Sequence, residues 1–175
     1  MPQSKTVSTA IIVLLLLGTA LTSSDRLGFS EFVFAANGHL PENGPQPSAE
    51  TKAVAQSFSK DRAFRYVIFK LTDNLAQIEP EKPAPISATY QDFLKALPQN
   101  QPRYALYYLD AKENKGKSKI VFISWAPDHS KIKDKMAYNS SRNVIRAVCS
   151  GVELETQGTN LDELSYAKLL EKAAS

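Results

Sequence analysis

The residues from Lys131 to Met136 carry the most distinctive chemistry in this sequence. Lys131, Lys133 and Lys135 alternate with other residue types, and Met136 follows directly. On a helix, Lys133 and Lys135 would lie on either side of one face, where they could reach separate carboxylates. Met136 would add an adaptable apolar contact beside them. This combination favours contact with an acidic protein surface over catalysis in a pocket.

A structural interpretation of the same segment competes with this one. Apolar residues between positions 128 and 150 recur at helical spacing. They predict a buried stripe made of Ile132, Met136, Val144, Ile145 and Val148. In that case Met136 belongs to the core and the neighbouring lysines are simply solvated. Composition alone favours this second interpretation.

The sequence contains no recognisable catalytic or metal-binding constellation. His39 and His129 lack cysteines or carboxylates at ligand spacing, so we expect no metal site and no cofactor. Neither a phosphate-binding glycine loop nor a nucleophile elbow is found. The single cysteine, Cys149, follows an apolar stripe and is expected to be a core thiol. We therefore expect a binding protein rather than an enzyme.

Charge is distributed unevenly along the chain. The 175 residues carry a net charge of +3, which is too small to indicate nucleic-acid binding. Residues 112–146 nevertheless contain nine Lys or Arg against three Asp or Glu, whereas residues 147–175 contain two against five. A basic region followed by an acidic tail indicates a protein partner that binds in one orientation.

The patterns of hydrophobicity and turn residues predict an alternation of helices and strands. Helices are expected over residues 48–60, 89–97, 128–150 and 161–173, and strands over residues 64–71, 76–81, 104–110, 119–125 and 152–157. Ser48 would cap the first helix, and Gly151 would close the long helix. This order predicts an α/β (α+β) fold, in which a mixed sheet is flanked on both faces by helices.

Two local features refine that prediction. Pro80, Pro83 and Pro85 are expected to end the pairing of the second strand and to mark an edge or a loop. Ser140 and Ser141 are expected to bend the long helix and so divide it into two parts.

The N-terminal part of the chain differs in composition from the rest. Lys5 precedes a run of about twelve apolar residues, which resembles a secretory signal and is shorter than the roughly 20 residues of a membrane-spanning helix. A segment rich in Pro, Gly and Asn, residues 38–47, then indicates a boundary. We interpret residues 1–47 as an atypical extension and residues 48–175 as the domain. The extension could be a signal or anchor, a nonfunctional addition, or a mis-predicted start.

Four blocks of the domain resemble the ADF/cofilin family, whose members carry the actin-depolymerising factor homology domain. The blocks are RYVIFKL, LPQNQPRYALYYLD, KSKIVFISWAPDHSKIKDKMAYNSS and GTNLDELSYAKLLEK, which begin at positions 65, 97, 117 and 158. They occur in the family's order and with similar spacing over about residues 48–175. The resemblance implies the fold of that domain, and a monomeric protein that binds actin monomers and filaments and promotes filament severing and depolymerisation.

The resemblance also implies two sets of contact residues. Contact with both monomers and filaments is expected from Lys131, Lys133, Lys135, Met136, Arg142 and Arg146. Contact with filaments only is expected from Lys117, Lys119, Glu171 and Lys172. The family usually has Lys-Asp-Ala-Leu and two basic residues where this chain has residues 142–147. This departure is expected to weaken contacts with the monomer or with phosphoinositides, a second ligand class that the resemblance implies.

Two alternatives to a cytoplasmic filament-severing protein stay open. One is a protein like glia maturation factor, which binds the actin-related nucleation complex. The other is a secreted or membrane-associated domain that has lost actin binding, and Asn139 would then be a glycosylation acceptor. The segment 133–138 favours the cofilin branch, which implies a location at the actin cytoskeleton or in the nuclear matrix.

Overall fold

The computed structural model describes residues 44–174. Most of the predicted extension, including its signal-like apolar run, lies outside the described residues. Within the part that is described, no helix is long and apolar enough to cross a bilayer.

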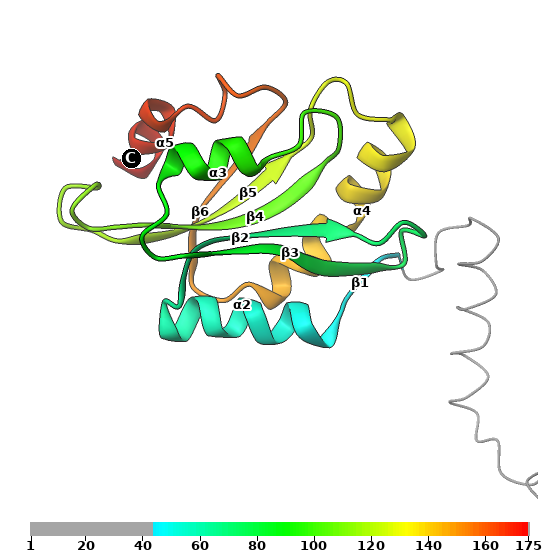
Figure 1. The fold of residues 1–175 in the computed structure, drawn as a ribbon, viewed down its shortest axis with the longest axis horizontal. Coiled ribbons are helices and arrows are strands. Elements are labelled where there is room, and N and C mark those ends of the chain that lie inside the picture. Colours follow the sequence, from blue (N-terminus) through cyan, green and yellow to red (C-terminus); the bar gives the residue numbers. More distant parts are fainter. Residues whose placement is uncertain (1–43, 175) are drawn as a thin grey trace, which may run out of the picture. The chain divides into compact units, whose positions relative to one another are not determined.

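Residues 44–174 form one mixed sheet of six strands, in the order β1-β3-β2-β4-β5-β6 (Figure 1). The strands are β1 (Gln46–Pro47), β2 (Phe64–Leu71), β3 (Gln77–Pro85), β4 (Arg103–Leu109), β5 (Lys119–Trp125) and β6 (Val152–Gly158). The pairs β3–β2, β2–β4 and β4–β5 are antiparallel, whereas β1–β3 and β5–β6 are parallel. A parallel neighbour requires a crossover, and the long helix between β5 and β6 provides it.

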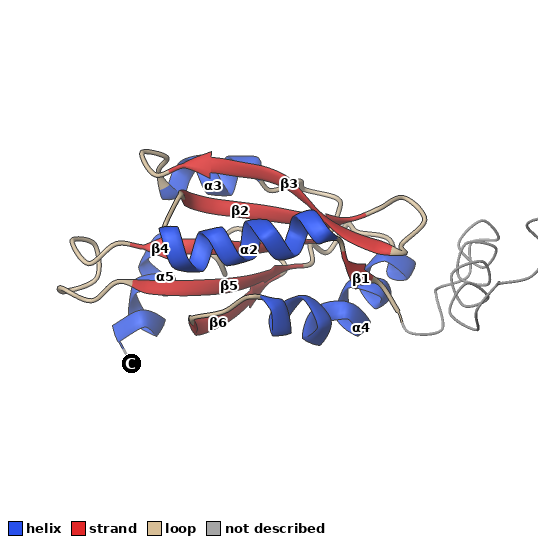
Figure 2. Cartoon of the chain, turned by 90° about the horizontal axis from the view of Figure 1, so that it is seen from below, coloured by secondary structure: helices blue, strands red, loops and turns tan. Residues whose placement is uncertain are grey.

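The helices cover both faces of the sheet, as the sequence predicts. Helices α2 (Ala49–Asp61) and α4 (Ile132–Val148) lie on one face, and α3 (Tyr90–Ala96) and α5 (Tyr166–Ala174) lie on the other (Figures 1 and 2). Because successive side chains of a strand point to opposite faces, β2 supplies Ile68 to one core and Val67 and Phe69 to the other.

The starts of two helices are fixed by side-chain caps. Ser48 Oγ accepts a hydrogen bond from the Thr51 backbone N–H at 3.1 Å, which confirms the predicted cap of α2. At α3, Thr89 and Asp92 form a reciprocal capping box. Gly151 has a φ of +70°, and it turns the chain from the end of α4 into β6.

The prediction that prolines end the pairing of β3 is wrong. Strand β3 continues through all three prolines, and Pro80, Pro83 and Pro85 face residues of β2. Two irregularities interrupt the register of the β2–β3 pair. Beyond Ile78, β3 has no strand on its other side within the described residues, because β1 pairs only with Gln77 and Ile78. An edge strand tolerates proline, since an N–H on its open side needs no strand partner.

The long helix and the segments at the two ends of the domain also differ in detail from the sequence-based expectation. Helix α4 begins at Ile132, because residues 127–130 form a turn closed by the Ser130 N–H and the Pro127 carbonyl at 2.9 Å. It continues unbroken through residues 140–141, although both serine hydroxyls bond the Ala137 carbonyl. A short turn at Asp162 and Glu163 is also expected before the last helix; the structure has a turn over residues 161–164, and α5 begins at Tyr166. Strand β1, only two residues long, gives no periodic signal in the sequence.

Candidate functional site

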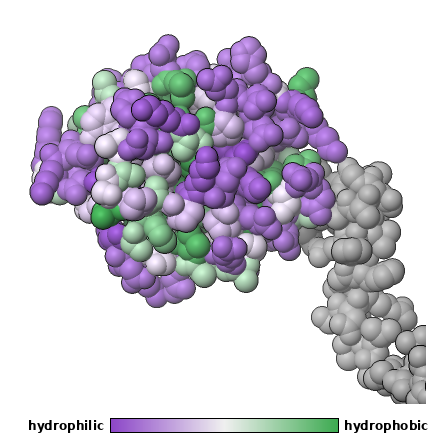
Figure 3. Space-filling view, viewed as in Figure 1, coloured by the Kyte–Doolittle hydropathy of each residue, from purple (hydrophilic) through white to green (hydrophobic). Residues whose placement is uncertain are grey.

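The first two turns of α4 present apolar side chains to solvent. Ile132 is 78% exposed and Met136 is 66% exposed, one helical turn apart. Figure 3 shows an apolar spot over these turns, at the upper right of the view, surrounded by hydrophilic surface. The predicted buried stripe is therefore wrong at Ile132 and Met136. Exposed side chains of this size among charged neighbours are typical of a contact surface.

The lysines of this segment lie around the apolar pair. Lys131 and Lys133 are exposed, whereas Lys135 is partly buried. The ammonium group of Lys135 donates a hydrogen bond to the Asp128 carbonyl at 3.1 Å, which restrains its direction. Lys131 occupies the position before the helix and makes no side-chain cap, so the first backbone N–H groups of α4 have no such partner. The start of α4 therefore combines three cationic side chains with the partial positive charge of a helix N-terminus.

The opposite face of α4 packs against the sheet. Its buried residues are Ala137, Tyr138, Ser141 and Ile145. The Tyr138 hydroxyl accepts a hydrogen bond from the Leu71 N–H at 2.8 Å. The Tyr104 hydroxyl donates to the Tyr138 carbonyl and lies 2.8 Å from Ser141 Oγ. These buried polar contacts allow one rotation of the helix, and that rotation turns Ile132 and Met136 outward.

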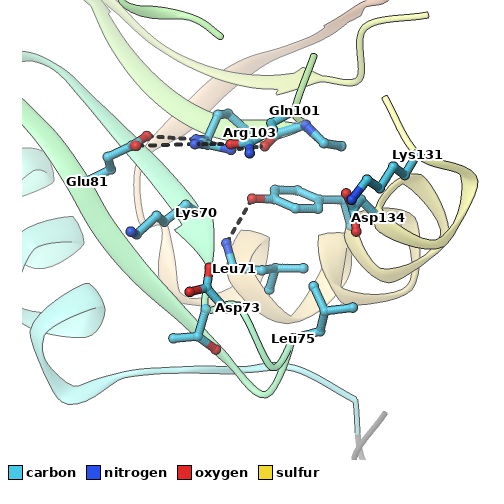
Figure 4. Close-up of a pocket in the computed structure, with 12 residues that line it drawn as sticks. Lys70, Leu71, Asp73, Leu75, Glu81, Gln101, Arg103, Lys131 and Asp134 are labelled. Atoms are coloured by element: carbon cyan, nitrogen blue, oxygen red, sulfur yellow. Dashed lines mark hydrogen bonds and ion pairs between the residues drawn. The ribbon is translucent and has the colours of Figure 1, made fainter. Parts of the chain in front are cut away.

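A surface pocket of about 380 Å³ lies beside the start of α4 (Figure 4). Its charged lining consists of Lys70, Arg103 and Lys131 with Asp73, Glu81 and Asp134. Arg103 and Glu81 bond at 2.7 and 3.2 Å along one wall. Because cations and carboxylates are equal in number, the pocket does not favour an ion of either sign. Among residues 44–174, no cluster of His, Cys, Asp and Glu could hold a metal.

The two arginines expected in the same contact set lie further along α4. Arg142 and Arg146 both bond Glu155 on β6, at 2.5 and 2.7 Å. They face the edge of the sheet, whereas Ile132 and Met136 extend into solvent. Cys149, at the end of the helix, is buried in the core as predicted. Burial raises the pKa of its thiol to about 12, which keeps the group unreactive.

Three of the four residues expected to contact only filaments lie on α5 or bond to it. Lys119 opens β5 and donates from Nζ to the Ala173 carbonyl at 2.7 Å. Lys172 donates to Thr156 Oγ1 on β6, also at 2.7 Å. Lys117 precedes β5 and is exposed, and Glu171 is exposed on α5. The structure thus brings Lys119, Glu171 and Lys172 to one end of the molecule, and two of these side chains help to hold that end together.

Comparisons with known proteins identify the family to which this fold belongs. A family model described as "Cofilin/tropomyosin-type actin-binding protein" matches residues 45–174. The chain belongs to the ADF/cofilin family. An actophorin from Entamoeba histolytica is 35% identical over 130 residues, covering 74% of this chain and 94% of the relative. An actin-depolymerizing factor 2 from Oryza sativa subsp. japonica is 43% identical over 114 residues, covering 64% and 79%.

A solved ADF/cofilin structure supports the assignment. The cofilin of Streptomyces griseoflavus superposes with a TM-score of 0.69 at 34% identity, covering 75% of this chain and 98% of that one. The recognition of the ADF/cofilin family and of its fold from the sequence is therefore confirmed.

Two features of this ADF/cofilin chain escape inspection of the sequence. The exposure of Ile132 is one, because the helical spacing of its apolar neighbours predicts that it is buried. In the sequence Glu155 is only one carboxylate of an acidic tail, although in the structure it binds both arginines of α4. The charge excess of residues 112–146 was a signal for such a partner, because it predicts that nearby carboxylates lie against the basic helix.

Proposed function

We propose that this ADF/cofilin domain binds actin monomers and filaments and promotes filament severing and depolymerisation. The observation that carries the proposal is the exposure of Ile132 and Met136 between lysines at the start of α4. The family match over residues 45–174 supports it. The relatives named above are themselves called actophorin and actin-depolymerizing factor.

In this proposal the first turns of α4 form the contact common to monomers and filaments. Ile132 and Met136 enter an apolar depression of actin, and Lys131, Lys133 and Lys135 bond carboxylates at its rim. An interface of this type gains binding energy from apolar anchors that exclude water around charged hydrogen bonds.

A second contact is used only on filaments. We assign it to the side of the domain that carries Lys117, Lys119, Glu171 and Lys172. A domain that bridges two neighbouring subunits changes their relative twist, and the boundary between decorated and bare filament breaks. The free energy that changes the twist comes from tighter binding to the twisted filament than to the bare one, so no catalytic residue is needed.

The location and the other partners follow from the same proposal. The protein acts as a monomer in the cytosol, at the actin cytoskeleton, and Asn139 carries no glycan. Phosphoinositides are a competing ligand class for the basic surface of α4. Treating the full chain from eukaryotic cells with a glycosidase tests the location, since a mass shift would contradict it.

The test of function uses the full chain and purified actin. Cosedimentation measures binding to filaments, a fluorescence titration measures binding to monomers, and microscopy of single filaments counts severing events. We expect binding to both forms and a rise in severing. If the chain neither pellets with filaments nor binds monomers, the proposed function is wrong. Binding only to the actin-related nucleation complex would instead favour the function of a glia maturation factor.

A further inference from the structure

Glu155 lies on the exposed surface of β6 and holds two arginines of α4. Arg142 Nη2 donates to Glu155 Oε2 at 2.5 Å, and Arg146 Nε donates to Glu155 Oε1 at 2.7 Å. Each carboxylate oxygen therefore receives one guanidinium group. The hydrogen bond from Arg146 is the largest of several causes that lower the pKa of Glu155. The carboxylate is consequently ionised at neutral pH.

The remaining nitrogens of the two arginines are also directed toward the protein. Arg146 donates from Nη1 to the Cys149 carbonyl at 3.1 Å and from Nη2 to the Val152 carbonyl at 3.5 Å. Arg142 donates from Nε to Ser124 Oγ at 3.3 Å. All three nitrogens of Arg146 and two of Arg142 thus have partners within the chain. Neither group extends freely toward a partner protein.

The arginines continue the flank of α4 that begins at Lys135. Residues 135, 142 and 146 are spaced by seven and four positions, so they lie on one side of the helix. At about 1.5 Å per residue, the flank extends for roughly 16 Å. Without Glu155 it would carry three positive charges in a row. With Glu155, one arginine charge is neutralised and both guanidinium groups are turned toward β6.

We propose that Glu155 is an intramolecular counterion that limits the affinity of α4 for actin. It withholds Arg142 and Arg146 from the acidic surface of the partner and confines the cationic contact to the first turns of the helix. This inference rests on the proposed function. It differs from the expectation drawn from the family resemblance, which assigns both arginines to the actin contact.

Replacing Glu155 by a neutral residue would leave the positive charges of Arg142 and Arg146 without their counterion. In Glu155→Gln the side chain keeps its size, but its amide binds the guanidinium groups more weakly than a carboxylate does. Each guanidinium group then keeps only neutral partners, so its charge is no longer offset and can attract the carboxylates of actin. Attraction between exposed charges acts over roughly 10 Å at 0.1 M salt, so the gain must shrink as salt rises.

Glu153→Gln is the matched control. Glu153 precedes Glu155 by two positions on β6 and is also exposed, and it forms no ion pair or hydrogen bond with an arginine in the described structure. Both substitutions raise the net charge by the same amount, and only one of them releases Arg142 and Arg146. Any difference between the two variants therefore reports the release rather than the overall charge.

The experiment measures the affinity of the full chain for monomeric actin at 50 mM and 200 mM salt. We expect Glu155→Gln to bind about three- to fivefold more tightly at low salt, the range typical of one added exposed ion pair. Glu153→Gln should change the affinity by less than about twofold. Adding both Arg142→Gln and Arg146→Gln to Glu155→Gln should remove the gain, and Glu155→Asp, which keeps the charge, should bind like the unmodified chain.

The outcomes separate this inference from the function on which it rests. If the unmodified chain does not bind actin, the proposed function fails. If it binds and Glu155→Gln matches Glu153→Gln, the counterion role is overturned. Weaker binding by Glu155→Gln also overturns it, because Glu155 would then position α4 for actin rather than restrain it.

Discussion

Lys119 Nζ donates a hydrogen bond to the Ala173 carbonyl at 2.7 Å and so ties the start of β5 to the end of α5. A cation at the C-terminus of a helix satisfies a carbonyl that has no partner within the helix, and it complements the helix dipole. The side chain is therefore used inside the domain, although the family resemblance predicts that it contacts filaments. Lys117, two residues earlier, is exposed.

This difference predicts that Lys117→Ala and Lys119→Ala have different effects. Lys117→Ala should weaken cosedimentation with filaments and leave both monomer affinity and melting temperature unchanged. Lys119→Ala should also lower the free energy of unfolding by about 0.5–1.5 kcal/mol, because the Ala173 carbonyl loses its partner. Thermal melting and cosedimentation of both variants provide the comparison. Equal melting temperatures would show that the bond to Ala173 contributes nothing to stability.

The Tyr138 hydroxyl predicts a larger loss of stability. Tyr138→Phe removes the acceptor of the buried Leu71 N–H, which lies 2.8 Å away. A buried donor without a partner costs about 1–3 kcal/mol, so chemical denaturation should show a decrease of that size. Tyr108→Phe on β4 is the control, because Tyr108 is only partly buried and its hydroxyl makes no hydrogen bond in the described structure. A loss no larger than that of the control would contradict the role of this bond.

The pair of Glu81 and Arg103 predicts a pH dependence of stability. The hydrogen bond from Arg103, the largest of several causes, lowers the pKa of Glu81 from its ordinary 4.5. A carboxylate whose pKa is lower in the folded state stabilises the fold above its unfolded pKa. That contribution is lost as pH falls through the folded value. Glu81→Gln should therefore lower the free energy of unfolding by about 1–3 kcal/mol at pH 7.

The gap between the unmodified chain and Glu81→Gln should close at acidic pH. Urea unfolding between pH 7 and pH 3 measures it, and the difference should begin to shrink near pH 4.5. Glu79→Gln on the same strand is the control, since Glu79 makes no ion pair in the described part of the chain. A constant gap across this range would show that the charge of Glu81 does not stabilise the fold.

The position of β1 refines the boundary that was expected after residue 47. The Gln46 N–H bonds the Ala76 carbonyl and the Ser48 N–H bonds the Ile78 carbonyl, both at 3.0 Å. A chain that begins at Gly44 keeps both bonds, whereas a chain that begins at Ser48 loses the first and leaves the second at a free terminus. We expect both chains to fold, with the shorter one melting several degrees lower. Equal melting temperatures would mean that β1 contributes no stability.

The sequence predicts most of the fold because local patterns and tertiary packing agree. Strands β2 and β5 begin and end where their hydrophobic patterns do, since both lie in the middle of the sheet and are buried on both faces. The prolines of β3 indicate an edge or a loop, but they do not reveal that the strand continues past Pro80 and Pro83, because that depends on which strand lies on its paired side.

The candidate site was only partly predictable for a related reason. The helical spacing of Ile132 and Met136 suits a buried stripe as well as an exposed ridge. The rotation of α4 decides between them, and that rotation depends on the bonds of Tyr138 to Leu71 and Tyr104, which are distant from the helix in sequence. The partner of the two arginines, Glu155, lies on a strand that only the parallel crossover brings beside them.

The central claim is that the first turns of α4 contact actin, and the affinity of Lys133→Ala/Lys135→Ala for monomeric actin tests it most directly. Lys52→Ala/Lys60→Ala on α2 removes the same charge from exposed positions on another helix. Losing charged contacts at an interface costs about 2–5 kcal/mol, so we expect at least a 30-fold loss of affinity. The melting temperature should fall only slightly, because the bond between Lys135 and the Asp128 carbonyl is exposed to solvent. The α2 variant should bind almost normally. Equal affinities of the two variants would contradict the account.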